Sequence, residues 1–212
     1  MTVAELLEKL GGIPPERVRL QPPPGTATEE DLLAIQEREG RMCELVDGVL
    51  VEKPVGYPES SLAAWIITLL TNFAHQHDLG NVAGESGSAR LMPGLVRIPD
   101  VSFISWDRLP ERMIPTDPIL SLAPDLAAEI LSPSNTKREM DMKIREYFLS
   151  GVRLVWLVDP RKRCVRVYTA PDRSRLLKED QTLDGGEVLP GLSLPVHQIF
   201  ERLPRRQPRR RS

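Results

Sequence analysis

The sequence contains few of the residues that hold small or secreted domains together. Two cysteines, Cys43 and Cys164, occur in 212 residues, and both fall within runs expected to be strands. We interpret them as buried, reduced thiols of a cytosolic protein rather than as a disulfide or a metal-binding pair. The three histidines show no zinc-ligand spacing. These absences exclude a disulfide-rich secreted scaffold and a zinc finger.

Long hydrophobic segments are also missing. The longest apolar run, 62–70, is interrupted by Thr68 and is far shorter than the roughly 20 residues that span a bilayer. The first residues do not combine a basic region with an apolar core, so no signal peptide is expected. With 41% hydrophobic and 27% charged residues, the chain is typical of a globular protein. We therefore expect a cytoplasmic protein without a membrane segment.

Charge is distributed unevenly along the chain. The net charge is −2, yet residues 202–212 contain six arginines and no acidic residue, which leaves −8 for the preceding body. A basic, proline-broken end of this kind is typical of a disordered appendage, which we assign to residues 204–212. Such a tail can contact nucleic-acid phosphates without sequence preference, but a solvated end explains it equally well.

The order of expected elements predicts one domain over residues 28–203, preceded by an N-terminal helix and a proline-rich segment at 1–27. The Asp47-Gly48 pair predicts a β-hairpin near the start of this domain. Helices alternating with strands predict an α/β or α+β fold, with a mixed central sheet flanked by helices. The main expected elements are helices at 60–77 and 136–149, buried strands at 126–131 and 153–158, and one strand at 95–105 that is bent or lies at a sheet edge at Pro99.

Three carboxylates lie in apolar surroundings on separate expected strands: Glu44, Asp100 and Glu129. An isolated ionised carboxylate is costly to bury, so each must be neutral, paired with a cation or bound to a metal. Together they suggest an oxygen-ligand site for a hard cation. Taken singly, each is also explained by a solvent-facing strand position or by a structural ion pair, and the periodicity does not show that they converge.

A lysine provides a second candidate for chemistry. On the expected helix 136–149, Lys143 lies at the edge of an apolar stripe that includes Met140 and Tyr147, so its ammonium can reach a site beside the core. A surface lysine whose stem lies along the apolar face is the alternative. Lys137, at the turn that enters this helix, is the rival candidate.

Several motifs resemble those of one known family. They are Glu44-Leu45-Val46-Asp47-Gly48, Pro99-Asp100-Val101, Pro124-Asp125-Leu126, Glu129-Ile130-Leu131-Ser132-Pro133-Ser134, Lys143 with Tyr147, and Gly151-Val152 with Val155-Trp156-Leu157-Val158-Asp159-Pro160. The pattern resembles the Uma2 (DUF820) family, which is assigned to the PD-(D/E)XK, restriction-endonuclease-like nucleases. The resemblance covers residues 28–200, nearly the whole body.

This resemblance implies a restriction-endonuclease-like fold and metal-dependent hydrolysis of phosphodiester bonds in nucleic acid, with DNA favoured. It implies Asp100 and Glu129 as ligands of Mg²⁺, for which Mn²⁺ can substitute, and Glu44 as an auxiliary acid and further ligand. The family's lysine normally lies two residues beyond the second acid, where this chain has Leu131. Related nucleases move this lysine to the following helix, and Lys143 resembles the relocated group.

Two other classes of function stay open at this stage. One is a catalytically inactive nuclease-like fold that acts as a DNA-binding or dimerising scaffold. The other is a structural dimer with buried ion pairs. The acidic body argues mildly against a broad phosphate-binding surface, and a homodimer would suit the cutting of two strands, although no heptad pattern indicates one.

Overall fold

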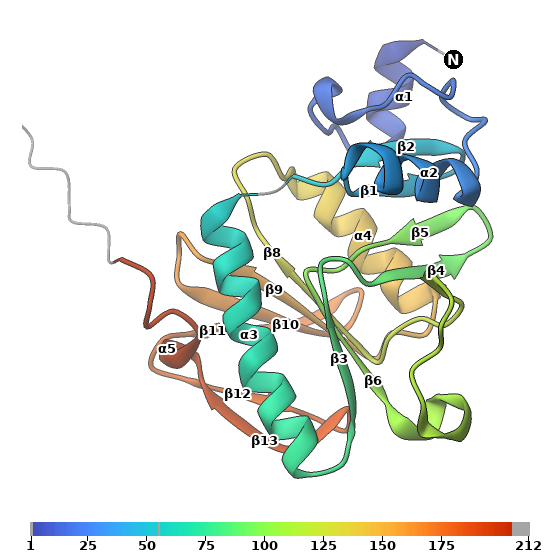
Figure 1. The fold of residues 1–212 in the computed structure, drawn as a ribbon. Helices are drawn as coiled ribbons and strands as arrows, with labels where there is room; N and C mark the ends of the chain where they lie inside the picture. Colours follow the sequence, from blue (N-terminus) through green and yellow to red (C-terminus); the bar gives the residue numbers. More distant parts are fainter. Residues whose placement is uncertain (1, 55, 205–212) are drawn as a thin grey trace, which may run out of the picture.

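The structure is a computed structural model that describes residues 2–54 and 56–204 (Figure 1). Its helices are α1 (Val3–Lys9), η1 (Pro15–Arg17), α2 (Glu29–Glu39), α3 (Tyr57–Gln76), η2 (Trp106–Arg108), η3 (Pro110–Arg112), α4 (Lys137–Leu149) and α5 (Val196–Ile199), where η marks a 3₁₀ helix. Its strands are β1 (Cys43–Val46), β2 (Val49–Glu52), β3 (Gly80–Gly84), β4 (Ser88–Met92), β5 (Leu95–Arg97), β6 (Val101–Ser105), β7 (Ile119–Leu120), β8 (Leu126–Ile130), β9 (Leu154–Asp159), β10 (Cys164–Ala170), β11 (Arg173–Lys178), β12 (Thr182–Gly185) and β13 (Leu189–Pro195).

The strands form a mixed α+β architecture, as the sequence predicts. A six-stranded sheet has the order β11-β10-β9-β8-β6-β3, and β8 pairs with β9 in parallel while its other neighbour, β6, is antiparallel. A five-stranded sheet has the order β2-β1-β5-β4-β7, and β12 pairs with β13. The expected Asp47-Gly48 hairpin is formed by β1 and β2.

The prediction of one continuous strand over residues 95–105 is wrong. The segment contains two strands, β5 and β6, which belong to different sheets. Pro99 lies between them, and proline lacks the amide hydrogen that a continuing strand ladder requires. The chain therefore leaves one sheet and enters the other at residues 98–100, which places Asp100 directly before β6.

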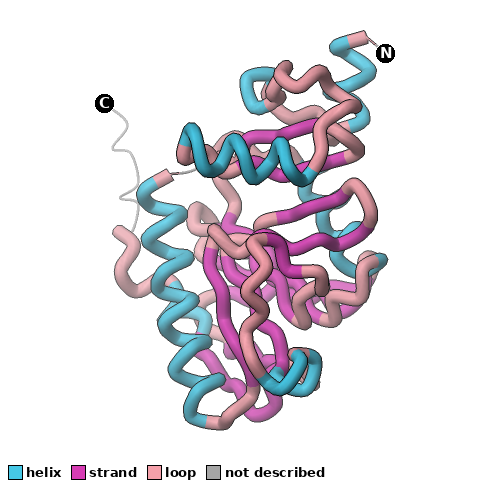
Figure 2. The backbone as a smooth tube through the Cα atoms, turned by 45° about the vertical axis from the view of Figure 1, so that its right-hand side comes forward, coloured by secondary structure: helices cyan, strands magenta, loops and turns pink. Residues whose placement is uncertain are grey.

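Helices α3 and α4 pack on opposite faces of the six-stranded sheet (Figures 1 and 2). Side chains alternate along a strand, so Leu126, Ala128 and Ile130 of β8 join the apolar cluster that contains α3, and Ala127 joins the cluster that contains α4. Both faces of β8 are thus buried, which explains its nearly continuous apolar run. By the same alternation, Glu129 lies on the face that α4 covers.

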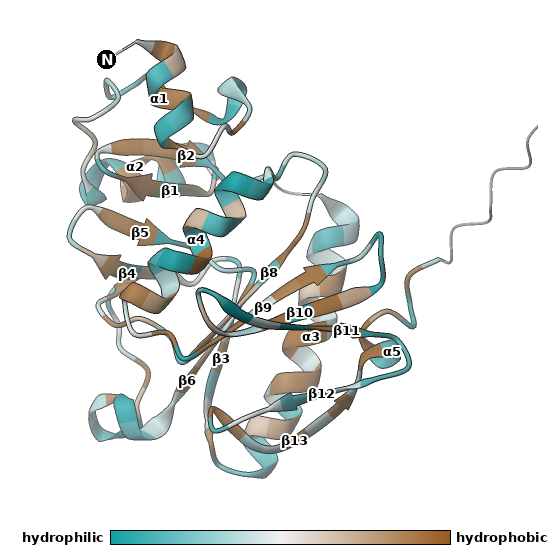
Figure 3. Cartoon of the chain, turned by 180° about the vertical axis from the view of Figure 1, so that it is seen from behind, coloured by the Kyte–Doolittle hydropathy of each residue, from teal (hydrophilic) through white to brown (hydrophobic). Residues whose placement is uncertain are grey.

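Helix α3 is the longest helix and packs through Leu62, Ile66 and Leu70, which lie at helical spacing and are almost fully buried. Figure 3 shows its hydrophobic residues in brown beside the brown strands of the sheet. Within the described residues, no helix combines the length and the hydrophobicity that crossing a bilayer would require.

Helix α4 begins at a well-defined cap. The Thr136 side chain accepts a hydrogen bond from the Glu139 amide, and the Glu139 carboxylate accepts one from the Thr136 amide, which is a capping box. The Thr136 hydroxyl also donates to the Gly11 carbonyl at 2.6 Å. Together with the packing of Leu6 and Leu10 into the same cluster as α4, this contact joins the N-terminal segment to the body.

The remaining expectations concern the cysteines and the basic tail. Cys43 and Cys164 are buried free thiols, which confirms the prediction that they are not paired. The expected disordered tail, apart from Pro204, lies outside the described residues.

Candidate active site

A small cavity of about 20 Å³ lies beside the end of β8, the start of α4 and the segment that follows β2. Acidic and basic side chains dominate its lining, which includes Lys53, Glu59, Glu85, Asp100, Glu129 and Lys143. A larger cavity of about 250 Å³ lies between β3, β4 and the loop before β8, and its single charged lining residue among those described is Asp117. Of these two cavities, only the smaller one brings acidic and basic side chains together.

Glu129 is held by two side chains of α4. The Tyr147 hydroxyl donates to Glu129 Oε1 at 2.6 Å, and Lys143 Nζ lies 3.3 Å from the same oxygen. Positions 143 and 147 are one helical turn apart, so both side chains meet the strand from the same face. Burial raises the pKa of Glu129; Lys143 opposes this effect and the nearby Asp100 adds to it.

Glu44 contacts Lys143 on the side away from the cavity and is almost completely buried. Its Oε1 is 2.9 Å from Lys143 Nζ, and its Oε2 accepts a hydrogen bond from Arg97 at 2.7 Å. Burial alone would raise the pKa of this carboxyl group, but Lys143 and Arg97 hold the pKa well below its ordinary value. Burial disfavours the charged form of Lys143, yet Glu129 and Glu44 together raise its pKa. Both Glu44 and Lys143 are therefore ionised near neutral pH.

Asp100 is bound by a lysine that the sequence analysis did not identify. Lys53 Nζ lies 2.7 Å from Asp100 Oδ1 and donates to the Ile98 carbonyl at 2.6 Å. The other carboxylate oxygen of Asp100 accepts a hydrogen bond from the Ile130 amide at 2.6 Å. A lysine at the end of an expected hairpin strand looks like a surface residue, so no local pattern distinguishes Lys53.

The predicted residues are brought together in part. Asp100, Glu129 and Lys143 line one cavity, whereas Glu44 does not line it and contacts Lys143 from behind. Lys137 is 89% exposed and pairs with Asp141 on the surface of α4. The structure therefore places Lys143, and not Lys137, at the carboxylates.

A metal ion in this cavity would have two of the three predicted carboxylates as ligands. The described residues contain no group of three or more His, Cys, Asp and Glu side chains arranged to hold a metal ion. Asp100 and Glu129 nevertheless face the same cavity, and no donor of the described chain contacts Glu129 Oε2. Mg²⁺ is commonly held by one or two carboxylates together with water and phosphate oxygens, so this pair fits Mg²⁺ or Mn²⁺.

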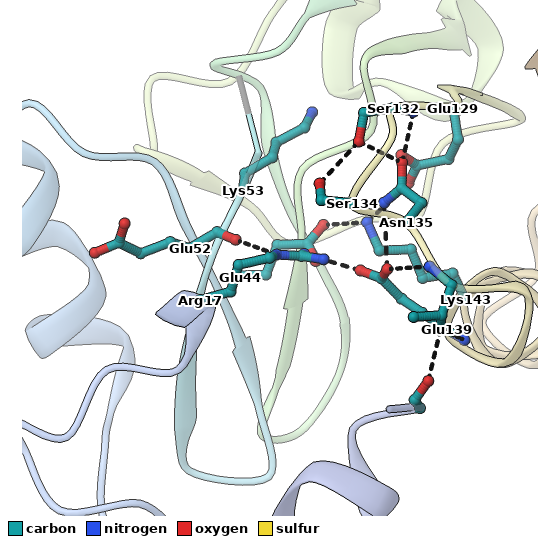
Figure 4. Close-up of polar contacts among 12 residues, drawn as sticks. Arg17, Glu44, Glu52, Lys53, Glu129, Ser132, Ser134, Asn135, Glu139 and Lys143 are labelled. Carbon is teal, nitrogen blue, oxygen red and sulfur yellow. Dashed lines mark hydrogen bonds and ion pairs between the residues drawn. The ribbon is translucent and has the colours of Figure 1, made fainter. Parts of the chain in front are cut away.

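A polar network fixes the loop between β8 and α4 (Figure 4). The Asn135 side chain accepts a hydrogen bond from the Ser132 amide at 2.9 Å and donates to Glu139 at 3.2 Å. Arg17 of the N-terminal segment lies 2.8 Å from the Glu139 carboxylate and donates to the Glu52 carbonyl. These contacts hold α4 in place and, with it, Lys143. The Thr-x-x-Glu capping pattern is the one sequence signal that could have identified Glu139.

Two comparisons with known proteins both lead to the Uma2 (DUF820) family. Residues 29–197 match the model of the Uma2 family, which is described as a putative restriction endonuclease. The fold is similar to the crystal structure of a putative nuclease belonging to DUF820 from Anabaena variabilis, with a TM-score of 0.70 and 21% identity. That similarity covers 82% of this chain and 97% of the other. No curated protein matches the chain.

Proposed function

Because the chain belongs to the Uma2 family, we propose that it is a metal-dependent nuclease that hydrolyses phosphodiester bonds of nucleic acid, with DNA as the favoured substrate. The observation that carries this proposal is the placement of Asp100, Glu129 and Lys143 around one cavity. Two carboxylates can hold a divalent ion that offsets the charge of a phosphodiester, and an ammonium group beside them can stabilise further negative charge.

Asp100 and Glu129 would hold the metal ion. Mg²⁺ or Mn²⁺ bound there would act as a Lewis acid that offsets the negative charge of the phosphate. Tyr147 donates to one oxygen of Glu129 and so orients the carboxylate, which leaves the other oxygen for the ion.

Lys143 would act on the phosphate or on the attacking water. Its ammonium group is kept charged by Glu129 and Glu44, and it borders the cavity where the phosphate would lie. A fixed positive charge in a buried site stabilises charge that develops in the transition state, because it needs no reorientation at the moment of reaction. Glu44 and Arg97 would serve as positioning residues that hold Lys143 in place.

Cleavage of labelled oligonucleotides tests this function. We expect the protein to cut at least one of a panel of single-stranded and duplex DNA and RNA substrates with Mg²⁺ or Mn²⁺, to leave 5′-phosphate ends, and to be inhibited by EDTA. Asp100→Asn and Glu129→Gln should each reduce the rate by about 10³-fold or more. Asp117→Asn, in the larger cavity, is the matched control and should leave the rate unchanged.

Two results would reject the proposal. Cleavage that survives in both Asp100→Asn and Glu129→Gln would show that another site does the chemistry. Binding of DNA without cleavage of any substrate would favour the inactive scaffold.

A further inference from the structure

Lys53 carries the one ammonium group in contact with Asp100 among the described residues. Its side chain is only 4% exposed, although it follows directly after β2. Lysine is rarely buried to this extent unless it is paired. Here the pairing is with Asp100 and the Ile98 carbonyl, and both contacts lie at the point where the chain passes between the two sheets.

The backbone of Lys53 is fixed, and its side chain reaches the cavity from there. The Lys53 amide donates to the Met42 carbonyl at 2.9 Å, which extends the hairpin ladder by one residue. Figure 4 shows the Lys53 side chain leaving the chain away from that of Glu52, as expected for neighbouring residues of a strand. The ammonium thus enters the cavity from the hairpin, whereas Lys143 enters it from α4.

Asp100 has no oxygen without a donor. Oδ1 contacts Lys53, and Oδ2 accepts from the Ile130 amide. A cation already occupies the carboxylate that a metal would use. We propose that Lys53 is a tethered cation that competes with the divalent metal for Asp100, so that metal binding requires Lys53 to release this carboxylate.

The charge balance of the ion pairs at and beside the cavity supports this proposal. With every group ionised, the Lys53–Asp100 pair and the separate set of ion pairs around Lys143 have a net charge of −1 together, from the cations Lys53, Arg97 and Lys143 and the anions Glu44, Asp100, Glu129 and Glu146. Without the lysine at Asp100 the net charge becomes −2, which matches a divalent ion. The attraction for such an ion is therefore weaker while Lys53 stays in place.

The cavity also offers the released ammonium another partner. Glu59 and Glu85 line the same cavity as Lys53 and Asp100. One oxygen of Glu85 accepts a hydrogen bond from the Ser60 hydroxyl, and no donor of the described chain contacts the other. An ammonium group that released Asp100 would therefore still border a cavity that contains two other carboxylates.

The inference rests on the proposed function, because it takes Asp100 as a metal ligand. Its test is the dissociation constant for Mn²⁺, measured from the loss of the free-ion EPR signal during titration. We expect Lys53→Met, which removes the charge with an unbranched side chain only one heavy atom shorter, to bind Mn²⁺ at least about tenfold more tightly than the wild type. Lys137→Met removes an exposed lysine from α4 and should leave the constant unchanged.

Two further variants make the result specific. Lys53→Gln keeps a hydrogen-bond donor for Asp100 without the charge, and should also tighten Mn²⁺ binding; it serves as the test should Lys53→Met fail to fold. The double variant Lys53→Met with Asp100→Asn should lose the gain, which places the effect at this carboxylate.

The possible outcomes separate the two proposals. An unchanged or weaker affinity in both Lys53 variants, with Mn²⁺ binding that Glu129→Gln abolishes, would overturn the role of Lys53 and keep the proposed metal site. Mn²⁺ binding by a Lys53 variant but not by the wild type would support the inference. Absence of Mn²⁺ binding in every variant would overturn both.

Discussion

The Nζ atom of Lys143 lies 3.3 Å from Oε1 of Glu129, although the two residues are 14 positions apart and belong to a helix and a strand. Thr136 caps the helix, and the strand lies between two neighbours in the sheet, so both partners are fixed by regular structure. Lys143 thus supplies an ammonium group beside Glu129. The family pattern would place this group at position 131, where the chain has Leu131. This geometry is compatible with the predicted relocation of the family's lysine to the next helix.

Replacement of Lys143 by methionine should affect both cleavage and stability. We expect the rate of Mg²⁺-dependent cleavage to fall about 10²–10³-fold, because a fixed positive charge is lost from the site. We also expect the free energy of unfolding to fall by about 3–5 kcal/mol, because Glu44 and Glu129 lose their shared cation while buried. Single-turnover kinetics and urea unfolding measure the two effects.

Lys137→Met is the matched control for this prediction, since it removes a lysine of the same helix whose ion pair is exposed. It should change the free energy of unfolding by less than about 1 kcal/mol. Equal cleavage rates for Lys143→Met and the wild type would remove Lys143 from the site.

Glu44 should make the protein more stable above its unfolded-state pKa than below it. Lys143 and Arg97 hold the pKa of Glu44 below its ordinary value in the folded state. Its stabilising effect is therefore fully present above about pH 4.3, the unfolded value, and is lost as the pH falls below it. In Glu44→Gln the free energy of unfolding should decrease less steeply with falling pH in this range, as measured by urea unfolding.

The exposed Glu30 provides the comparison for this measurement. Glu30→Gln should keep the wild-type pH dependence. If Glu44→Gln also kept it, the ion pairs of Glu44 would not contribute to stability.

The sequence was sufficient for the elements whose signals are local. The Asp47-Gly48 turn predicted the β1–β2 hairpin, and the apolar stripe predicted α4 to within one residue of its start. The apolar run around Glu129 predicted a buried strand, and the order of the elements predicted the fold class.

Contacts between distant segments were not predictable in the same way. Lys53 contacts Asp100 only because β5 and β6 belong to different sheets. The sequence pattern predicted a single strand in place of β5 and β6. Arg97 reaches Glu44 across paired strands, and its short strand shows no pattern that marks a buried charge. Because these pairings depend on sheet order, the sequence did not reveal that Lys143 lies between Glu44 and Glu129 or that Lys53 contacts Asp100.

The junction between the N-terminal segment and α4 depends on a close backbone approach at Gly11. This residue has φ +82°, and a Cβ there would lie 2.7 Å from the Cα of Glu139. Gly12 has φ +70°, but a Cβ there would meet nothing within 4 Å. Gly12→Ala should therefore lower the free energy of unfolding by about 1–2 kcal/mol, because alanine is strained in the left-handed backbone conformation.

Gly11→Ala should lower the free energy of unfolding by this amount and by about 1–3 kcal/mol more, because the N-terminal segment must move away from α4 to make room for the Cβ. Urea unfolding of the two variants isolates this difference. Equal losses for Gly11→Ala and Gly12→Ala would show that the approach to α4 does not contribute to stability.

Location of the metal ion tests the central claim most directly. Crystals of the wild type and of Lys53→Met, soaked in Mn²⁺ and measured at a wavelength where manganese scatters anomalously, would show the position of the ion. The account predicts an anomalous peak between the carboxylates of Asp100 and Glu129, with higher occupancy in Lys53→Met. A peak at another place, or no peak at these residues in a protein that cleaves nucleic acid with Mn²⁺, would contradict it.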